Sequence, residues 1–115
     1  MKEAATRERI EALQRRGLQQ KTIVILTNDN GGVGLSHSAP LFHRKFSAWE
    51  GGIRVPALIR WPGRIPAGTV SAQVGITMDL TASILAATAT PVLSDARLEG
   101  VNLLPILERK APRVE

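Results

Sequence analysis

The chain has 115 residues, 43% of them hydrophobic, which is the composition of a globular domain rather than of a disordered segment. It contains no cysteine, so disulfides, thiolate metal sites and cysteine nucleophiles are excluded for these residues. The net charge is +5, but the basic residues are scattered and are not interleaved with aromatic side chains, so we expect no nucleic-acid binding.

The first predicted element is a helix from about residue 2 to residue 16. Ile10 and Leu13 form, with small alanines, a modest apolar stripe on an otherwise charged surface. Gly17 follows, and glycine is the usual residue just beyond a helix C-terminus. The mixed-charge start lacks the apolar core of a signal peptide, so we expect nothing in it to direct export, and the compartment stays unknown.

The next predicted element is a strand at residues 22–27. Its continuous run of β-branched and apolar residues is typical of a strand covered on both faces, as in a parallel sheet flanked by helices. A second strand is predicted at residues 55–60, where Pro56 restricts it to a sheet edge or to the first residues of a strand. Two such strands cannot cover themselves, so we expect a larger α/β domain or self-association through the unpaired strand edges.

A glycine-rich segment without clear periodicity, residues 28–52, separates the two strands. It is much longer than the usual connection of about 4–6 residues, and long loops in compact domains are commonly functional. A second helix is predicted from Asp79, as its N-cap, to about Ala89, and Pro91 ends it. The apolar stretch 100–107 follows, and the sequence predicts a frayed tail at 108–115.

The first candidates for chemistry come directly after the first strand. Asp29 and Asn30 can converge on one ion only where the chain turns, and Gly31–Gly32 permits such a turn. Their oxygen donors suit a hard cation such as calcium or magnesium. An ordinary Asx turn is the alternative that the local sequence favours. The position favours the metal site, because α/β proteins bind ligands at the carboxyl ends of buried parallel strands.

The same loop carries further polar candidates. Lys45 offers a compact charge with three donors that suits an oxyanion, although most loop lysines are merely exposed, and the neighbouring Arg44 competes for this role. His37 and His43 are the only histidines, and their spacing is not that of metal ligands. The segment 49–52 is more typical of packing and turns that hold a loop in place than of catalysis.

Four blocks of the sequence, in order, resemble the type I (arylsulfatase-like) sulfatases from about residue 8 to residue 107. The blocks are "TIVILTNDNGG", "APLFHRKFSAWEGGIRVPALIRWPGRIPAG", "ITMDLTASILA" and "LEGVNLLPIL". The resemblance implies that residues 1–115 are the C-terminal part of the family's catalytic domain. The implied fold is α/β, a partial alkaline-phosphatase-like α/β/α sandwich, with residues 28–52 as the active-site loop.

The resemblance also implies roles for individual residues. Asp29 and Asn30 match the Asp-Asn pair that supplies two ligands to the active-site calcium, and Lys45 matches the lysine that contacts the sulfate. The implied reaction is hydrolysis of a sulfate ester, of a small molecule or a sugar, by a hydrated formylglycine. We expect His37, His43 and Phe46 to border the substrate pocket.

The chain departs from the family pattern in ways that limit what it can do alone. The Cys/Ser-x-Pro-x-Arg motif that yields formylglycine is absent, and after Ser38-Ala39-Pro40 the arginine position holds Phe42. The nucleophile and the other metal ligands are missing, so we expect the chain alone to be inactive and to bind calcium poorly. Within the loop Phe42, His43 and Phe46 replace residues that are commonly Arg, Gly and Gly.

Two other functions stay open on the sequence. A non-catalytic interaction or complementation module derived from a sulfatase would associate through its strand edges. A related phosphoester hydrolase is less favoured, because residues 49–52 follow the sulfatase pattern. No apolar run approaches the roughly 20 residues that a membrane span needs, so we expect no membrane span. The resemblance implies that members of the family are often exported.

Overall fold

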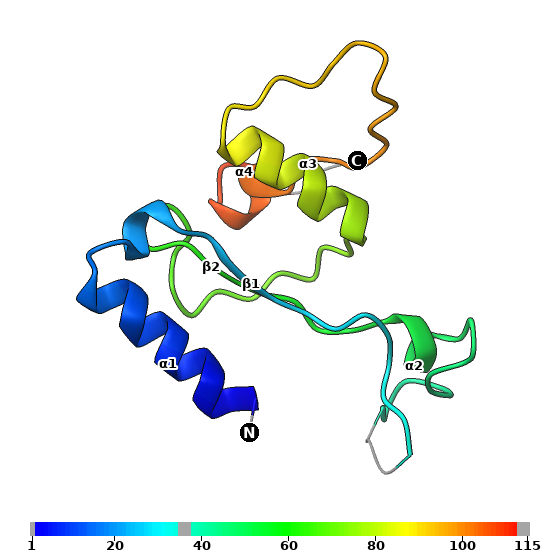
Figure 1. Ribbon diagram of the computed structural model, residues 1–115. Helices are drawn as coiled ribbons and strands as arrows, with labels where there is room; N and C mark the ends of the chain where they lie inside the picture. The colour runs from blue at the N-terminus through cyan, green and yellow to red at the C-terminus, as the bar shows by residue number, and fades with distance from the viewer. Residues whose placement is uncertain (1, 35–37, 113–115) are drawn as a thin grey trace. The chain divides into compact units, whose positions relative to one another are not determined.

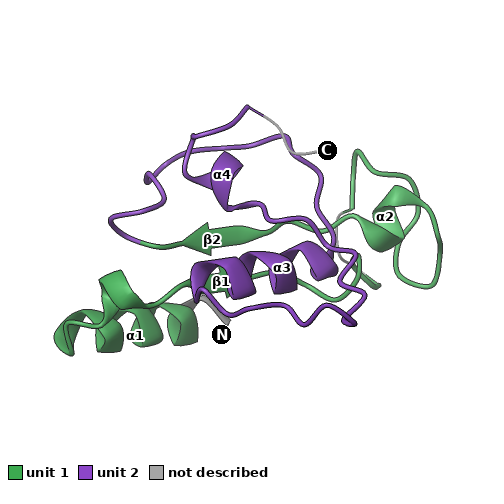
Figure 2. Cartoon of the chain, turned by 90° about the horizontal axis from the view of Figure 1, so that it is seen from above, with its two compact units in different colours: residues 1–61 green, residues 62–115 purple. Residues whose placement is uncertain are grey.

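A computed structural model describes residues 2–34 and 38–112 (Figure 1). The chain divides into two compact units, residues 1–61 and residues 62–115 (Figure 2). None of the helices in the described ranges is long and apolar enough to span a membrane. The elements are, in order, α1 (Lys2–Arg15), the 3-10 helix η1 (Gln19–Lys21), β1 (Val24–Leu26), α2 (Glu50–Ile53), β2 (Leu58–Arg60), α3 (Thr77–Ala87) and α4 (Leu104–Leu107).

Helix α1 confirms the predicted N-terminal helix, and its end follows from the sequence. Gly17 adopts the left-handed conformation, with φ at 65°, which glycine tolerates without strain. Its N–H donates to the carbonyl of Gln14 at 3.0 Å, and the N–H of Leu18 donates to that of Leu13 at 2.9 Å. This pair of bonds is a Schellman motif, which satisfies carbonyls that the helix leaves open.

Both predicted strands form, but they pair with each other in the antiparallel direction. Val24 lies opposite Arg60, and Leu26 lies opposite Leu58. The expected parallel arrangement is therefore wrong for this pair, because the connecting loop folds back on itself and returns the chain alongside β1. Strand β2 begins after Pro56, as the proline requires.

The predicted cover on both faces of the first strand is also not met within the described residues. Leu26 is 46% exposed and Leu58 is 63% exposed, although the two side chains lie opposite each other on one face of the sheet. Within residues 2–34 and 38–112 the two strands form a sheet of their own, and a two-stranded sheet without further strands at its edges cannot cover both of its faces.

In the second unit, helix α3 begins before the residue that the sequence favoured. Ile76 is the N-cap and Asp79 is the third helical residue, so the prediction of Asp79 as N-cap is wrong. Its buried carboxylate instead accepts the N–H of Ile76 at 2.8 Å and that of Val101 at 2.9 Å. Asp79 thus satisfies the start of the helix and also ties it to the segment before α4.

A small core in the second unit forms around this connection. The hydroxyl of Ser83 donates to the carbonyl of Asp79 at 2.6 Å and accepts the N–H of Leu103 at 2.9 Å. Leu104 and Ile106 of α4 are buried as well. The predicted apolar stretch 100–107 therefore supplies most of this core.

Glu108 follows α4, and its side chain is 5% exposed. Its carboxylate pairs with the ammonium of Lys110 and the guanidinium of Arg64, each at 2.6 Å. The hydrogen bond from Lys110 lowers the pKa of Glu108 below its usual value, burial opposes this, and the hydrogen bond and charge of Arg64 add to the lowering. The frayed tail expected at 108–115 stays a prediction.

This pairing makes the stability of the second unit depend on pH. A carboxylate whose pKa is lowered by folding contributes fully above its unfolded pKa, about 4.3, and the contribution is lost as pH falls further. We expect the free energy of unfolding, measured by urea titration on signals of residues 62–115, to fall below about pH 4.3. Glu108→Gln should remove that part of the pH dependence, and an unchanged profile in this variant would contradict the assignment.

Candidate functional site

Backbone hydrogen bonds between distant residues hold the described parts of the segment 28–52 together, and its last residues belong to α2. The N–H of Gly31 donates to the carbonyl of Gly52 at 2.8 Å, and the N–H of Lys45 donates to the carbonyl of Gly32 at 3.0 Å. These bonds join the turn after β1 to the middle of the loop and to α2. The described parts of the loop, residues 28–34 and 38–52, are therefore held against one another.

Three glycines are required where the loop's backbone segments touch. A Cβ atom on Gly31 would overlap the carbonyl of Gly51, and one on Gly51 would overlap the carbonyl of His43. A Cβ atom on Gly52 would overlap the carbonyl of Ser47. Gly31 and Gly51, from the glycine pairs at the two ends of the loop, therefore share one close backbone contact, whereas sequence reasoning treated the two pairs as separate turns.

Asp29 and Asn30 lie in the bend that follows β1. Asp29 is exposed, whereas Asn30 is half-buried and its amide nitrogen donates to the carbonyl of Gly31 at 2.9 Å. This bond leaves the side-chain oxygen of Asn30 as an acceptor, so the pair offers oxygen donors that fit calcium. Within residues 2–34 and 38–112 no group of three or more His, Cys, Asp or Glu side chains could hold a metal, so the pair would supply only part of a ligand shell.

Lys45 is half-buried, and its ammonium lies 5.4 Å from the centroid of the Phe46 ring. Because its backbone N–H is bonded to Gly32, the loop holds Lys45 beside the bend that carries Asp29 and Asn30. The structure thus brings the backbones of three predicted site residues into one region. Their roles in chemistry stay predictions.

His43 belongs to an aromatic cluster that the sequence analysis missed. Its ring centroid lies 4.4 Å from that of Phe42 and 6.3 Å from that of Trp49, and the Phe42 and Trp49 rings meet edge-on at 5.3 Å. A signal existed, since Trp61 is the only one of the chain's Phe and Trp residues outside residues 42–49. His37 lies outside the described residues.

The backbone of the loop is strained at two of the positions that depart from the family pattern. His43 and Phe46 have φ values of 64° and 72°, in the left-handed region. This conformation costs a residue with a side chain about 1–2 kcal/mol, and such strain clusters at functional sites. Glycine would adopt the φ values of both positions without strain, which agrees with the glycines that the family resemblance implies there.

We expect His43→Gly to relieve this strain. His43→Ala also lacks the ring but keeps the unfavourable φ. The free energy needed to open the loop should therefore be about 1 kcal/mol larger in His43→Gly than in His43→Ala. Amide hydrogen exchange of Lys45 should accordingly be about five-fold slower in His43→Gly than in His43→Ala. Equal or faster exchange in the glycine variant would show that the left-handed φ carries no strain.

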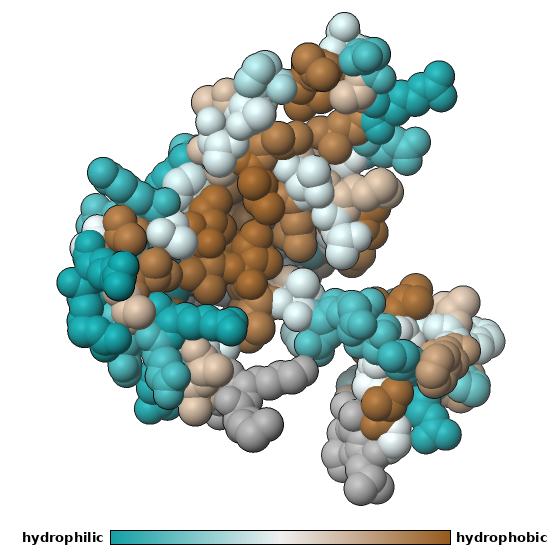
Figure 3. All heavy atoms as spheres, viewed as in Figure 1, coloured by the Kyte–Doolittle hydropathy of each residue, from teal (hydrophilic) through white to brown (hydrophobic). Residues whose placement is uncertain are grey.

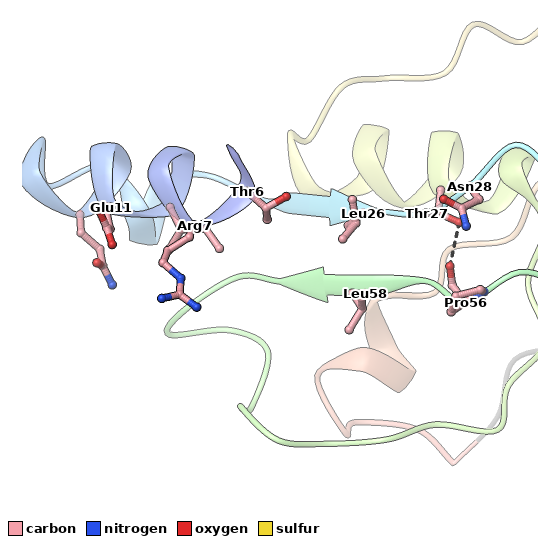
Figure 4. A pocket seen from close by; sticks show the side chains of 10 residues that line it. Thr6, Arg7, Glu11, Leu26, Thr27, Asn28, Pro56 and Leu58 are labelled. Atoms are coloured by element: carbon pink, nitrogen blue, oxygen red, sulfur yellow. Dashed lines mark hydrogen bonds between the residues drawn. The ribbon is translucent and has the colours of Figure 1, made fainter. Parts of the chain in front are cut away.

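A cavity of about 630 Å³ adjoins the carboxyl end of β1 (Figure 4). Figure 4 shows Leu26 and Leu58 on the two strands, and the hydroxyl of Thr27 donates to the carbonyl of Pro56 at 3.1 Å. The remaining lining residues are Thr6, Arg7, Ile10, Glu11, Gln14 and Asn28. The cavity adjoins the bend, because Thr27 and Asn28 immediately precede Asp29 in the sequence. Most of the surface that the cavity exposes is apolar, so it suits contact with an apolar group better than it suits catalysis.

These features define a mixed α/β chain with an oxygen-rich bend after a strand and a lysine held beside that bend by the loop. Comparisons with known proteins identify its family. Residues 4–90 match the family described as Sulfatase. The chain is 39% identical over 104 residues to N-acetylgalactosamine-6-sulfatase of Homo sapiens, covering 85% of this chain and 20% of that protein. It is 32% identical over 116 residues to steryl-sulfatase of Mus musculus, covering 92% of this chain and 19% of that protein.

A solved structure also matches the chain. The crystal structure of Ps i-CgsB in complex with k-i-k-neocarrahexaose matches with a TM-score of 0.81 and 31% identity, over 87% of this chain and 23% of that one. The chain therefore belongs to the sulfatase family, which confirms the resemblance seen in the sequence. It spans about a fifth of the length of the curated relatives it matches.

Proposed function

We propose that this chain is the C-terminal part of a sulfatase catalytic domain, with an alkaline-phosphatase-like α/β/α fold, and that it contributes to hydrolysis of a sulfate ester. The observation that carries the proposal is the hydrogen bond from the Lys45 N–H to Gly32. It fixes the backbone of the proposed sulfate contact beside the proposed metal ligands, Asp29 and Asn30. Membership of the sulfatase family supports the same arrangement.

Each residue has a distinct role in this proposal. The carboxylate of Asp29 and the side-chain oxygen of Asn30 would hold calcium, which when bound polarises the sulfate oxygens. The Lys45 ammonium would offset the negative charge of those oxygens. The formylglycine typical of the family has no precursor motif in this chain, so the nucleophile would come from another part of the domain.

The proposed substrate is a sulfated small molecule or sugar. The matched relatives are named N-acetylgalactosamine-6-sulfatase and steryl-sulfatase, and the matched crystal structure holds k-i-k-neocarrahexaose. His43 and Phe46 stand on either side of Arg44 and Lys45 in the sequence, so we propose that they border the substrate pocket. His37, which lies outside the described residues, is proposed for the same border from the sequence alone.

Completing the domain tests the proposal. Joined to the preceding part of a sulfatase domain, the chain should hydrolyse an aryl sulfate in a calcium-dependent manner. The 115-residue chain alone should show no turnover, and calorimetry should give a calcium Kd well above micromolar, because two ligands fall short of the 6–8 that calcium prefers. Micromolar calcium binding or sulfatase turnover by the chain alone would contradict this division of the site.

A second function, complementation of a separately encoded part of the domain, is favoured by the open faces of the first unit. Leu26 and Leu58 lie opposite each other and are exposed, and hydrophobic residues reach the surface in both units (Figure 3). Uncovered apolar faces and strand edges favour association. Size-exclusion chromatography that gave a stable monomer with cooperative unfolding would contradict this function.

A further inference from the structure

Phe46 combines two features that packing among the described residues does not explain. Its side chain is 94% exposed, so the ring gains almost nothing from burial. Its φ of 72° is one that glycine would adopt without strain. Among the described residues the ring lies outside the aromatic cluster of Phe42, His43 and Trp49, and it interacts instead with the ammonium of Lys45.

An exposed ring in strained backbone is accounted for if a ligand covers it. The strain is about 1–2 kcal/mol, and strained residues cluster at ligand contacts. The Lys45 ammonium lies over this ring, 5.4 Å from its centroid. A flat apolar face beside one cation is complementary to a ring that carries an anionic group.

Resting on the proposed function, we infer that Phe46 is a specificity-determining residue of the sulfatase site. The ring of a cyclic sulfate ester stacks on the face of Phe46 while its sulfate contacts Lys45. Phe46 therefore selects aryl or sugar sulfates over acyclic alkyl sulfates. An aryl ring offers its face or edge to Phe46, and a sugar offers its C–H groups.

NMR titration of the isotope-labelled chain tests the inference through the amide signals of Lys45 and residue 46. The probes are methyl sulfate, phenyl sulfate and glucose 6-sulfate. An aromatic contact is worth a factor of about 2 to 10, so at least one cyclic ester should bind tighter than methyl sulfate by this factor. Phenyl sulfate and glucose 6-sulfate distinguish an aryl from a sugar ring.

Three variants separate the ring from the fold and from the charge. Phe46→Gly relieves the backbone, so it should keep the Lys45 N–H protected from exchange and yet lose the preference for cyclic esters. Phe46→Trp should retain the preference. Lys45→Gln should lower the affinity for all three esters by a similar factor and leave the preference for cyclic esters unchanged.

The outcomes for the inference and for the proposed function differ. Equal affinity for cyclic and methyl esters, including no detectable binding of either, would overturn the inference, as would a preference that survives in Phe46→Gly. A preference that depends on Phe46 with no effect of Lys45→Gln would support the stacking surface and overturn the sulfate contact. Loss of methyl sulfate binding in Lys45→Gln without any effect of Phe46 substitutions would support the sulfate contact and overturn the stacking surface.

Discussion

A chain carrying Gly31→Ala is expected to lose the closed loop that holds the candidate site. The new Cβ would overlap the carbonyl of Gly51, and because both partners are backbone, neither can rotate away. The 2.8 Å hydrogen bond from residue 31 to Gly52 must then break, and Lys45 loses its position beside the bend. We expect a cost of about 3 kcal/mol, at the upper end for overpacking.

Gly34→Ala is the matched control for this prediction. Gly34 lies in the same loop with φ at 59°, but a Cβ there would meet nothing within 4 Å. It should therefore cost only the left-handed strain of about 1 kcal/mol. Hydrogen exchange of the Lys45 amide should be roughly 100-fold faster in Gly31→Ala and about five-fold faster in Gly34→Ala. Similar rates in the two variants would show that the loop is not closed through Gly31.

The elements could be predicted from the sequence because their signals are local. The apolar stripe and Gly17 defined the first helix, and the β-branched run and Pro56 defined the two strands. The direction of strand pairing could not be predicted, because it depends on the path by which the connecting loop returns to β1, and no local signal specifies that path. Asp79 was misplaced for a similar reason, since its second partner, Val101, comes from a distant part of the chain.

The residues of the candidate site could be named from the sequence, whereas their arrangement in space could be predicted only in part. Asp29, Asn30 and Lys45 were chosen by residue type and position, and the loop's backbone bonds bring them into one region. The left-handed backbone at His43 and Phe46 was not predicted, although histidine is enriched at positive φ and the resemblance implied glycine at both positions. The spatial arrangement shows that His43 and Phe46 both lie in left-handed backbone, which glycine would adopt without strain.

In a completed sulfatase domain, Asp29→Ala is expected to give the largest loss of activity among the substitutions considered. It removes the only charged group of the pair that we propose as calcium ligands. Removing one electrostatic contributor to a transition state commonly lowers kcat by about 10²–10³-fold, and we expect a loss of that size in kcat/KM for an aryl sulfate. Asn28→Ala is the control, because this exposed neighbour lines the cavity and should alter activity only a few-fold.

Calcium dependence separates a metal ligand from a residue that merely shapes the bend. Asp29→Asn keeps an oxygen donor but removes the charge, so its activity should recover as calcium is raised, whereas Asp29→Ala should recover less. If Asp29 only formed an Asx turn, Asn would substitute for it fully and the calcium concentration for half-maximal activity would not change. A shift of that concentration in Asp29→Asn, with the fold intact by hydrogen exchange at Lys45, would distinguish the metal site from the turn.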